Sequence, residues 1–389
     1  MRFQHAFLPA AGFWTTPFCK WGGGLANLHP LELAASVTKQ ALAKRSIDPA
    51  GLGEVVVGWT IPSRNCFYAG PWMAGMVGAE RATGAIVSQA CATGAAALAH
   101  AAAKLDAGDQ EPILVVLADK TSNGPHLVYP NPLGPGGKPD AEDWVWDSFS
   151  RDPWARNSML ETAENVAREG GFTREAQDAI TLLRHQQYAE AQADARYAEI
   201  VMPVEVNPSG RKVIATISAD EGVFPTSAEG LAKLQPVMKG GTVTFGSQTH
   251  PADGNAGFVV MTEAHAGADA VQVVSYAQAR VEKGFMAKAV VPAARKALAE
   301  AGIGIGDVAV IKTHNPFAVN DLYLARELEL APEAVNVGGS SLIFGHPQAP
   351  TGARLIAEGI VEARRRGGGY LLFAGCAAGD TAAAVVLKV

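Results

Sequence analysis

The sequence of 389 residues has little cysteine, no excess of positive charge and no long apolar run. Its four cysteines follow no metal-ligand spacing and form no dense framework, so we expect no resident metal, no disulfide-stapled fold and a reducing compartment, the cytoplasm. The formal net charge of −6 offers no basic stripe for nucleic acid. No stretch is long enough for a membrane span, and the N-terminus lacks the features of a signal peptide.

What the sequence does contain is a repeated order of elements within a chain that is 48% hydrophobic and can bury a large core. Residues 32–59 predict an amphipathic helix, a turn and a strand, and residues 288–313 repeat this order. Residues 92–117 add a helix and a strand, as residues 352–374 do. The repeat predicts two similar α/β units with buried parallel strands, whose C-terminal ends gather functional residues.

Between these units, residues 120–245 shift in composition towards proline, glycine, tryptophan and charge, which predicts an inserted loop domain. Four aromatic residues cluster there: Trp144, Trp146, Phe149 and Trp154. Two interpretations stay open: these side chains form a small core of the insertion, or they line an acyl pocket.

Cys91 stands in the run Ser88-Gln89-Ala90-Cys91-Ala92-Thr93-Gly94, just before an alanine-rich helix pattern. Small neighbours leave room for a bulky thioester, and the N-terminal end of a helix favours the thiolate over the thiol. The pattern therefore indicates a nucleophile, although a cysteine among alanines is also compatible with an inert buried residue.

Further downstream, the sequence has Gly345-His346-Pro347, then Thr351-Gly352-Ala353-Arg354, and finally Cys376-Ala377-Ala378-Gly379. Each motif alone is an ordinary turn or strand end. Together with Gln89-Ala90-Cys91-Ala92-Thr93-Gly94, and in this order, they resemble the thiolase family, and the resemblance runs over the whole length.

The resemblance implies the duplicated five-layered α-β-α-β-α thiolase fold, with residues 1–119 and 246–265 in one half, 120–245 as the insertion and 266–389 in the other half. It also implies a coenzyme A-dependent acyltransferase that is a homodimer or homotetramer. An accessory subunit is possible in this reading, and no permanently bound cofactor is expected because coenzyme A is a substrate.

By the same resemblance, Cys91 is acylated, His346 takes its proton, and Cys376 moves a proton to or from the substrate. Backbone N–H groups at Cys91 and near Ala378 would hold one oxyanion. The second oxyanion site departs from the commoner Asn-Glu-Ala-Phe, because this chain has His314-Asn315-Pro316-Phe317.

A histidine at this position resembles the sterol-carrier-protein-linked thiolases, and His314 could donate a hydrogen bond to the thioester oxygen. A second departure is Gln248-Thr249-His250-Pro251, where many thiolases have a serine-glycine pair that contacts pantetheine. Thr249 could replace the serine, whereas His250 in place of glycine puts the local backbone and acyl pocket in question.

Two rival functions remain at this stage. Cys91 with two histidines also resembles the decarboxylating ketoacyl synthases, but Cys376 argues against them because decarboxylation needs no second thiol. The other rival is a non-catalytic or partner-dependent subunit that binds coenzyme A esters, which a complete set of Cys91, His346 and Cys376 disfavours. The sequence predicts a thiolase acting on 3-oxoacyl-CoA or acyl-CoA, with neither direction nor acyl group specified.

Overall fold

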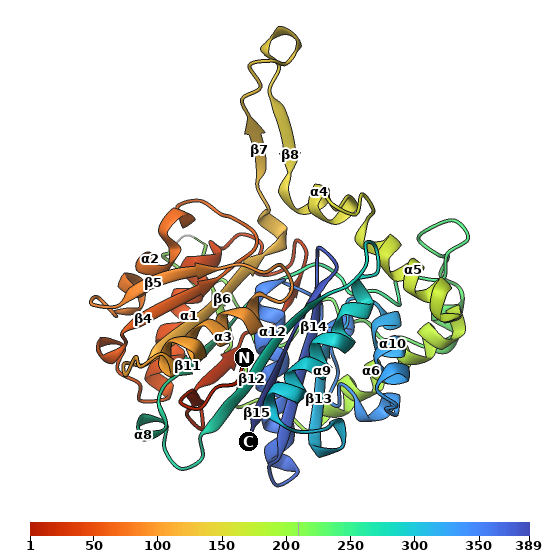
Figure 1. The fold of residues 1–389 in the computed structure, drawn as a ribbon. Coiled ribbons are helices and arrows are strands. Elements are labelled where there is room, and N and C mark those ends of the chain that lie inside the picture. Colours follow the sequence, from red (N-terminus) through yellow and green to blue (C-terminus); the bar gives the residue numbers. More distant parts are fainter. Residues whose placement is uncertain (209) are drawn as a thin grey trace.

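The computed structural model describes residues 1–208 and 210–389, and two mixed β-sheets form its body (Figure 1). The first sheet has the order β2-β11-β6-β4-β5, with β3 also paired to β11. Its strands are β2 (Phe13–Thr15), β3 (Cys19–Lys20), β4 (Glu54–Gly58), β5 (Thr83–Val87), β6 (Ile113–Lys120) and β11 (Ala252–Val260).

The second sheet has the order β1-β12-β15-β14-β13. Its strands are β1 (Phe7–Leu8), β12 (Val271–Arg280), β13 (Val308–His314), β14 (Tyr370–Ala377) and β15 (Thr381–Lys388). β4 runs parallel to β6, and β13 runs parallel to β14, as the repeat predicted. The repeat did not predict β11, β12 and β15, which pair antiparallel and make both sheets mixed.

Helices cover both sheets and separate them, which gives five layers. α3 (Thr93–Asp106) and α12 (Ala349–Arg365) lie between the sheets, and α12 packs on β6 and β11 as well as on β13 and β14. α1 (Pro30–Lys44) and α2 (Ala69–Val77) pack on the first sheet, and α9 (Val290–Ala301) packs on the second. The predicted α-β-α-β-α architecture and the repeated helices and strands are confirmed.

The two central helices approach closely because their residues are small. Every residue of α12 from Ala349 to Ala363 is buried, as expected for a helix covered on two faces. A Cβ on Gly94 would lie 2.8 Å from the Ala349 carbonyl oxygen, so glycine is needed where α3 begins beside α12. This contact brings the turn that carries Cys91 next to the turn that carries His346.

The segment between the halves contains α4 (Trp144–Ser150), α5 (Met159–Gly170), α6 (Arg174–Ala193), β9 (Val204–Val206), β10 (Ala215–Ile217) and α7 (Ala228–Ala232). It also contains the hairpin of β7 (His126–Tyr129) and β8 (Asp140–Asp143), which projects far from the body in Figure 1. The second half adds α10 (Ala318–Glu327) and the one-turn α11 (Ser341–Phe344), while α8 (Glu263–Ala266) joins the sheets.

The N-terminal β1 pairs with β12 and so belongs to the sheet of the C-terminal half. The predicted boundaries between the two halves and the insertion, at residues 119, 245 and 265, therefore stay a proposal. Within the described part of the chain, no helix is long and apolar enough to cross a membrane.

Candidate active site

The structure brings three of the four predicted catalytic residues into direct proximity. Cys91 precedes α3, His314 ends β13, and His346 lies in the turn between α11 and α12. The Cys91 sulfur and one ring nitrogen from each histidine all lie within 4.8 Å of one another, and the three side chains are buried. Cys376, inside β14 rather than after it, is fully buried and close enough to Cys91 to interact electrostatically.

The Cys91 sulfur is held as a thiol. Burial raises its pKa to about 12, and the Asp119 carboxylate adds to the shift, while the backbone N–H groups of Ala378 and Cys91 oppose it. The expectation that the helix start favours the thiolate was wrong for the free protein. Cys91 lies outside α3, whose N-cap is Ala92, and desolvation outweighs the two amides.

The two histidines present one unpaired ring nitrogen each. His314 Nδ1 lies 2.8 Å from Ser341 Oγ, and His346 Nδ1 lies 2.7 Å from Thr351 Oγ1. Both Nε2 atoms are buried without a hydrogen-bond partner among the described residues, and the ring centroids are 4.0 Å apart. Burial lowers the pKa of His314 to about 3, and burial followed by the neighbouring His314 lowers the pKa of His346, so both rings are neutral near pH 7.

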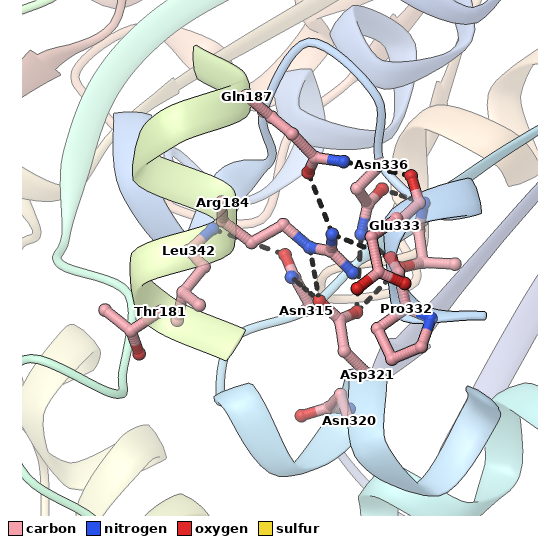
Figure 2. Close-up of polar contacts among 12 residues, drawn as sticks. Thr181, Arg184, Gln187, Asn315, Asn320, Asp321, Pro332, Glu333, Asn336 and Leu342 are labelled. Carbon is pink, nitrogen blue, oxygen red and sulfur yellow. Dashed lines mark hydrogen bonds and ion pairs between the residues drawn. The ribbon is translucent and has the colours of Figure 1, made fainter. Parts of the chain in front are cut away.

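A chain of hydrogen bonds supports His314 from behind. Ser341 Oγ donates to Asn315 Oδ1 at 3.3 Å, and Asn315 Nδ2 donates to Asp321 Oδ2 at 2.8 Å. Figure 2 shows that Asp321, on α10, faces Arg184 of α6, whose Nε donates to the carboxylate at 2.8 Å. Because the ionised Asp321 can only accept, it fixes the orientation of the Asn315 amide.

The same helix supports the second cysteine. Asn320, the residue before Asp321 on α10, donates from Nδ2 to Cys376 Sγ at 3.4 Å. Burial and the neighbouring Cys91 raise the pKa of the Cys376 thiol. One buried ion pair between α6 and α10 therefore anchors the supports of both His314 and Cys376.

Gln348 is a site residue that the sequence reasoning missed. The Cys91 thiol donates to its Oε1 at 3.2 Å, and its side chain is buried. Its backbone has φ 65° and ψ −109°, a conformation that costs a non-glycine residue about 1–3 kcal/mol. The only sequence signal was its place two residues after His346.

Asp119, near the end of β6, was also missed. Its carboxylate accepts from the backbone N–H groups of Thr60, Ile61 and Ala349 at 2.8, 3.0 and 3.0 Å. Burial raises its pKa to about 7 against these hydrogen bonds. The residue thus ties the loop after β4 to the first turn of α12, close to Cys91.

A cavity of about 930 Å³ opens beside this site and has Lys20, Trp21, Phe224, Phe245 and His250 in its wall. It is large enough for a small-molecule ligand of substantial size. The residues described around it do not include the four aromatic residues of the insertion, so they do not line this pocket. Trp146 and Trp154 are 69% and 56% exposed, so these two do not form a small core either.

His250 is accommodated rather than disruptive. Its backbone carbonyl accepts from His346 N–H at 2.9 Å, and its ring lies beside Gly222 and Gly345. A Cβ on either glycine would lie within 2.8 Å of His250 Nε2, and both glycines have positive φ. The glycine missing at position 250 is therefore compensated by two glycines that face the ring.

Thr249 lies against the site without lining the cavity. Its N–H donates to the Pro316 carbonyl at 2.7 Å, and its Oγ1 donates to the Ser341 carbonyl at 2.5 Å. The hydroxyl proton is therefore committed to Ser341, and only the oxygen lone pairs remain for a ligand.

Comparison with known proteins finds the same family along nearly the whole chain. Residues 11–264 match the family described as thiolase, N-terminal domain, and residues 268–389 match thiolase, C-terminal domain. An acetyl-CoA acetyltransferase of Shinella zoogloeoides is 30% identical, with 95% of each chain covered.

Two solved structures superimpose equally well. The acetyl-CoA acetyltransferase of Bacillus anthracis has a TM-score of 0.92 at 28% identity and covers 100% of this chain and 99% of its own. Human mitochondrial 3-ketoacyl-CoA thiolase in complex with CoA has a TM-score of 0.92 at 27% identity, with the same coverage. This chain belongs to the thiolase family.

Proposed function

We propose that this chain transfers acyl groups between carbon and coenzyme A through an acyl-Cys91 intermediate, in thiolytic cleavage of 3-oxoacyl-CoA or in the reverse Claisen condensation. The observation that carries the proposal is the buried cluster of the Cys91 sulfur with His314 and His346 nitrogens within 4.8 Å, beside Cys376. A nucleophile, a base and a second acid/base are the groups that this chemistry needs.

In the first half-reaction, Cys91 Sγ attacks the thioester carbonyl while its proton passes to His346 Nε2. The backbone N–H groups of Cys91 and Ala378, which already approach the sulfur, would hold the oxyanion. The C–S bond to coenzyme A then breaks, and His346 returns the proton to the leaving thiolate. Because His346 is neutral in the free protein, its Nε2 lone pair is ready to accept.

In the second half-reaction, in the condensing direction, Cys376 as the thiolate removes the α-proton of an incoming acyl-CoA. The carbanion attacks the carbonyl of acyl-Cys91 and forms the new C–C bond, while the C–S bond to Cys91 breaks. Cys91 leaves as the thiolate and takes up the proton that Cys376 released when it ionised. His314 would donate from Nε2 to the enolate oxygen in the tautomer that carries its proton on Nε2. In that tautomer the Ser341 hydroxyl turns its proton from Asn315 Oδ1 to His314 Nδ1. The Cys376 thiol has to ionise for this step, and the raised pKa makes that costly without substrate.

Coenzyme A would occupy the cavity beside the site, where Lys20 offers a cation for a phosphate and Phe224 and Phe245 offer apolar surface. Gln248 and His250 line the same cavity and would border the pantetheine. Thr249 would contact the pantetheine only as a hydrogen-bond acceptor, because its hydroxyl donates to the Ser341 carbonyl.

The sterol-carrier-protein-linked type is the finer assignment that we favour, because a histidine occupies the second oxyanion position. Cys376 disfavours a decarboxylating ketoacyl synthase, and the intact cluster disfavours a non-catalytic or partner-dependent subunit. We also propose a homodimer or homotetramer, since Val128 and Leu133 on the projecting hairpin are apolar and 67% and 97% exposed. We propose the cytoplasm as the compartment because all four cysteines are free.

The test is steady-state thiolysis of acetoacetyl-CoA by the purified chain alone, followed through the release of acetyl-CoA. Turnover by the unaccompanied chain, with initial rates that fit a ping-pong scheme, is expected. Turnover that appears only after a second protein is added would instead support the partner-dependent subunit.

A further inference from the structure

We propose that Cys91, His314 and His346 together form a reversible site for a thiophilic divalent cation, with Zn²⁺ as the ion that the donor set fits best. One sulfur and two imidazole nitrogens are the ligands that zinc takes in proteins, and three protein ligands leave a fourth position for water. Mg²⁺ and Ca²⁺ would need several oxygen ligands instead. Occupation would inhibit the enzyme, and that consequence alone rests on the proposed function.

The hydrogen bonds at the two histidine rings show which ring nitrogens are free to bind a cation. His314 Nε2 and His346 Nε2 are buried and unpaired among the described residues, whereas each Nδ1 faces a hydroxyl. One nitrogen of each ring lies within 4.8 Å of the Cys91 sulfur, and Nε2 is the one that is free to bind. Two unpaired nitrogens and a thiol that converge in a buried site carry a desolvation cost, which a bound cation would offset.

The outer contacts are those of a metal site. Metal-bound histidines usually donate their other ring N–H to an oxygen, and here Ser341 Oγ and Thr351 Oγ1 lie 2.8 and 2.7 Å from the two Nδ1 atoms. Ser341 can accept from His314 because its own proton can go to Asn315 Oδ1. The orientation of Asn315 is fixed in turn by the Arg184–Asp321 ion pair (Figure 2).

The geometry requires one small movement. Around tetrahedral zinc the ligand atoms lie roughly 3.3–3.7 Å apart, so a separation of up to 4.8 Å must close by about 1 Å. Side-chain rotations of the three residues would have to supply it, and a movement of the Cys91 sulfur costs its hydrogen bond to Gln348. The thiol releases its proton to solvent as the Zn–S bond forms, so the sulfur is no longer available to attack a thioester.

The experiment uses Co²⁺ as a spectroscopic substitute for zinc and the full-length protein stripped of metals. One Co²⁺ per chain is expected, with a near-ultraviolet thiolate-to-cobalt charge-transfer band that Zn²⁺ abolishes by displacement. Cys91→Ala should lose the band and bind at least about 100-fold more weakly, since outer contacts alone are worth about 10–100-fold. Ser341→Ala should weaken binding by about 10–100-fold.

Cys66→Ala, which removes a cysteine outside the site, is the matched control and should leave the band and the affinity unchanged. Wild-type protein alkylated at Cys91 with iodoacetamide repeats the test without a change in sequence and should also lose the band. Equal binding by Cys91→Ala or by the alkylated protein, or no charge-transfer band in the wild type, would overturn the proposal. Since the band needs no turnover, a failed metal site and a failed thiolase assignment give different results.

Discussion

The two halves of the chain place different residues at the same point of the same fold. β6 and β14 are both eight-residue strands beside a parallel neighbour, and their next-to-last residues are Asp119 and Cys376. Asp119 accepts from three backbone N–H groups. Cys376 accepts from the Asn320 side chain and from its own backbone N–H, within the described part of the chain.

In the mechanism that we propose, this difference separates a structural anchor, Asp119, from a reacting group, Cys376. Buried polar atoms that stabilise a fold are fully hydrogen-bonded, as Asp119 is. The C-terminal half instead leaves Cys376, His314 Nε2 and His346 Nε2 poorly paired. The strong interaction lies further from these atoms, in the ion pair between Arg184 of the insertion and Asp321. In the proposed mechanism, equivalent positions stabilise the fold in one half and react in the other.

The largest expected effect on rate follows from Cys376→Ala. Thiolysis should fall by about 10²–10⁴-fold, the usual contribution of a general acid or base, while acetyl transfer to Cys91 persists. Steady-state rates and the mass of the acetylated protein measure the two steps separately. Unchanged thiolysis would remove the distinction between Cys376 and its counterpart Asp119.

The largest expected effect on stability follows from Arg184→Met, which leaves the Asp321 carboxylate buried without its cation. Breaking one side of a buried pair should cost about 3–5 kcal/mol in the free energy of unfolding, measured in urea. The exposed Arg326 pairs with Glu327, so Arg326→Met is the control and should cost less than about 1 kcal/mol. Similar losses in both variants would show that the Arg184–Asp321 ion pair stabilises the fold no more than an exposed pair does.

A smaller effect is expected for Asp119→Asn, because an amide offers one acceptor oxygen to several N–H donors. The free energy of unfolding should fall by about 1–3 kcal/mol. The folded-state pKa of about 7 lies above the ordinary value, so this carboxyl stabilises the wild type most at acid pH and loses that contribution as pH rises towards 7. The gap in melting temperature between wild type and variant should therefore narrow from pH 5 to pH 8, and a widening gap would contradict the sign.

The smallest effect is expected for Gln348→Leu. Its Oε1 accepts from the Cys91 thiol, and a bond to the neutral form raises a thiol pKa, so removal should speed alkylation by iodoacetamide about 3–10-fold at pH 7. In the wild type, the thiol pKa of about 12 predicts an alkylation rate that rises about tenfold per pH unit between pH 7 and 9. A plateau below pH 8 would reveal a thiolate in the free protein.

Sequence patterns predicted the repeated helices and strands well. In each half, apolar residues recur with the spacing of an amphipathic helix and then form a continuous apolar run, which is typical of a buried strand. They also predicted that functional residues gather at the C-terminal ends of the strands, and His314 and Cys376 lie at the C-terminal ends of β13 and β14. The family fold and the thiolase assignment came from ordered motifs.

The antiparallel strands and the state of the nucleophile could not be predicted in this way. β15 pairs antiparallel with β14 because only three residues connect the two strands, and β12 then pairs on the other side of β15. The repeated pattern ended at residue 374 and did not extend to these strands. The pKa of Cys91 depends on total burial, which outweighs the local effect of a helix start. Gln348 and Arg184 act through contacts between segments far apart in the chain, and no local pattern marks them.

The most direct test of the acyl-Cys91 intermediate is the intact-protein mass after brief mixing with acetyl-CoA, followed by a chase with free coenzyme A. Wild-type protein should gain one acetyl group that the chase removes, and Cys91→Ala should gain none. An adduct of equal yield in Cys91→Ala, or no adduct in a wild-type sample that turns over acetoacetyl-CoA, would contradict the assignment of Cys91 as the nucleophile.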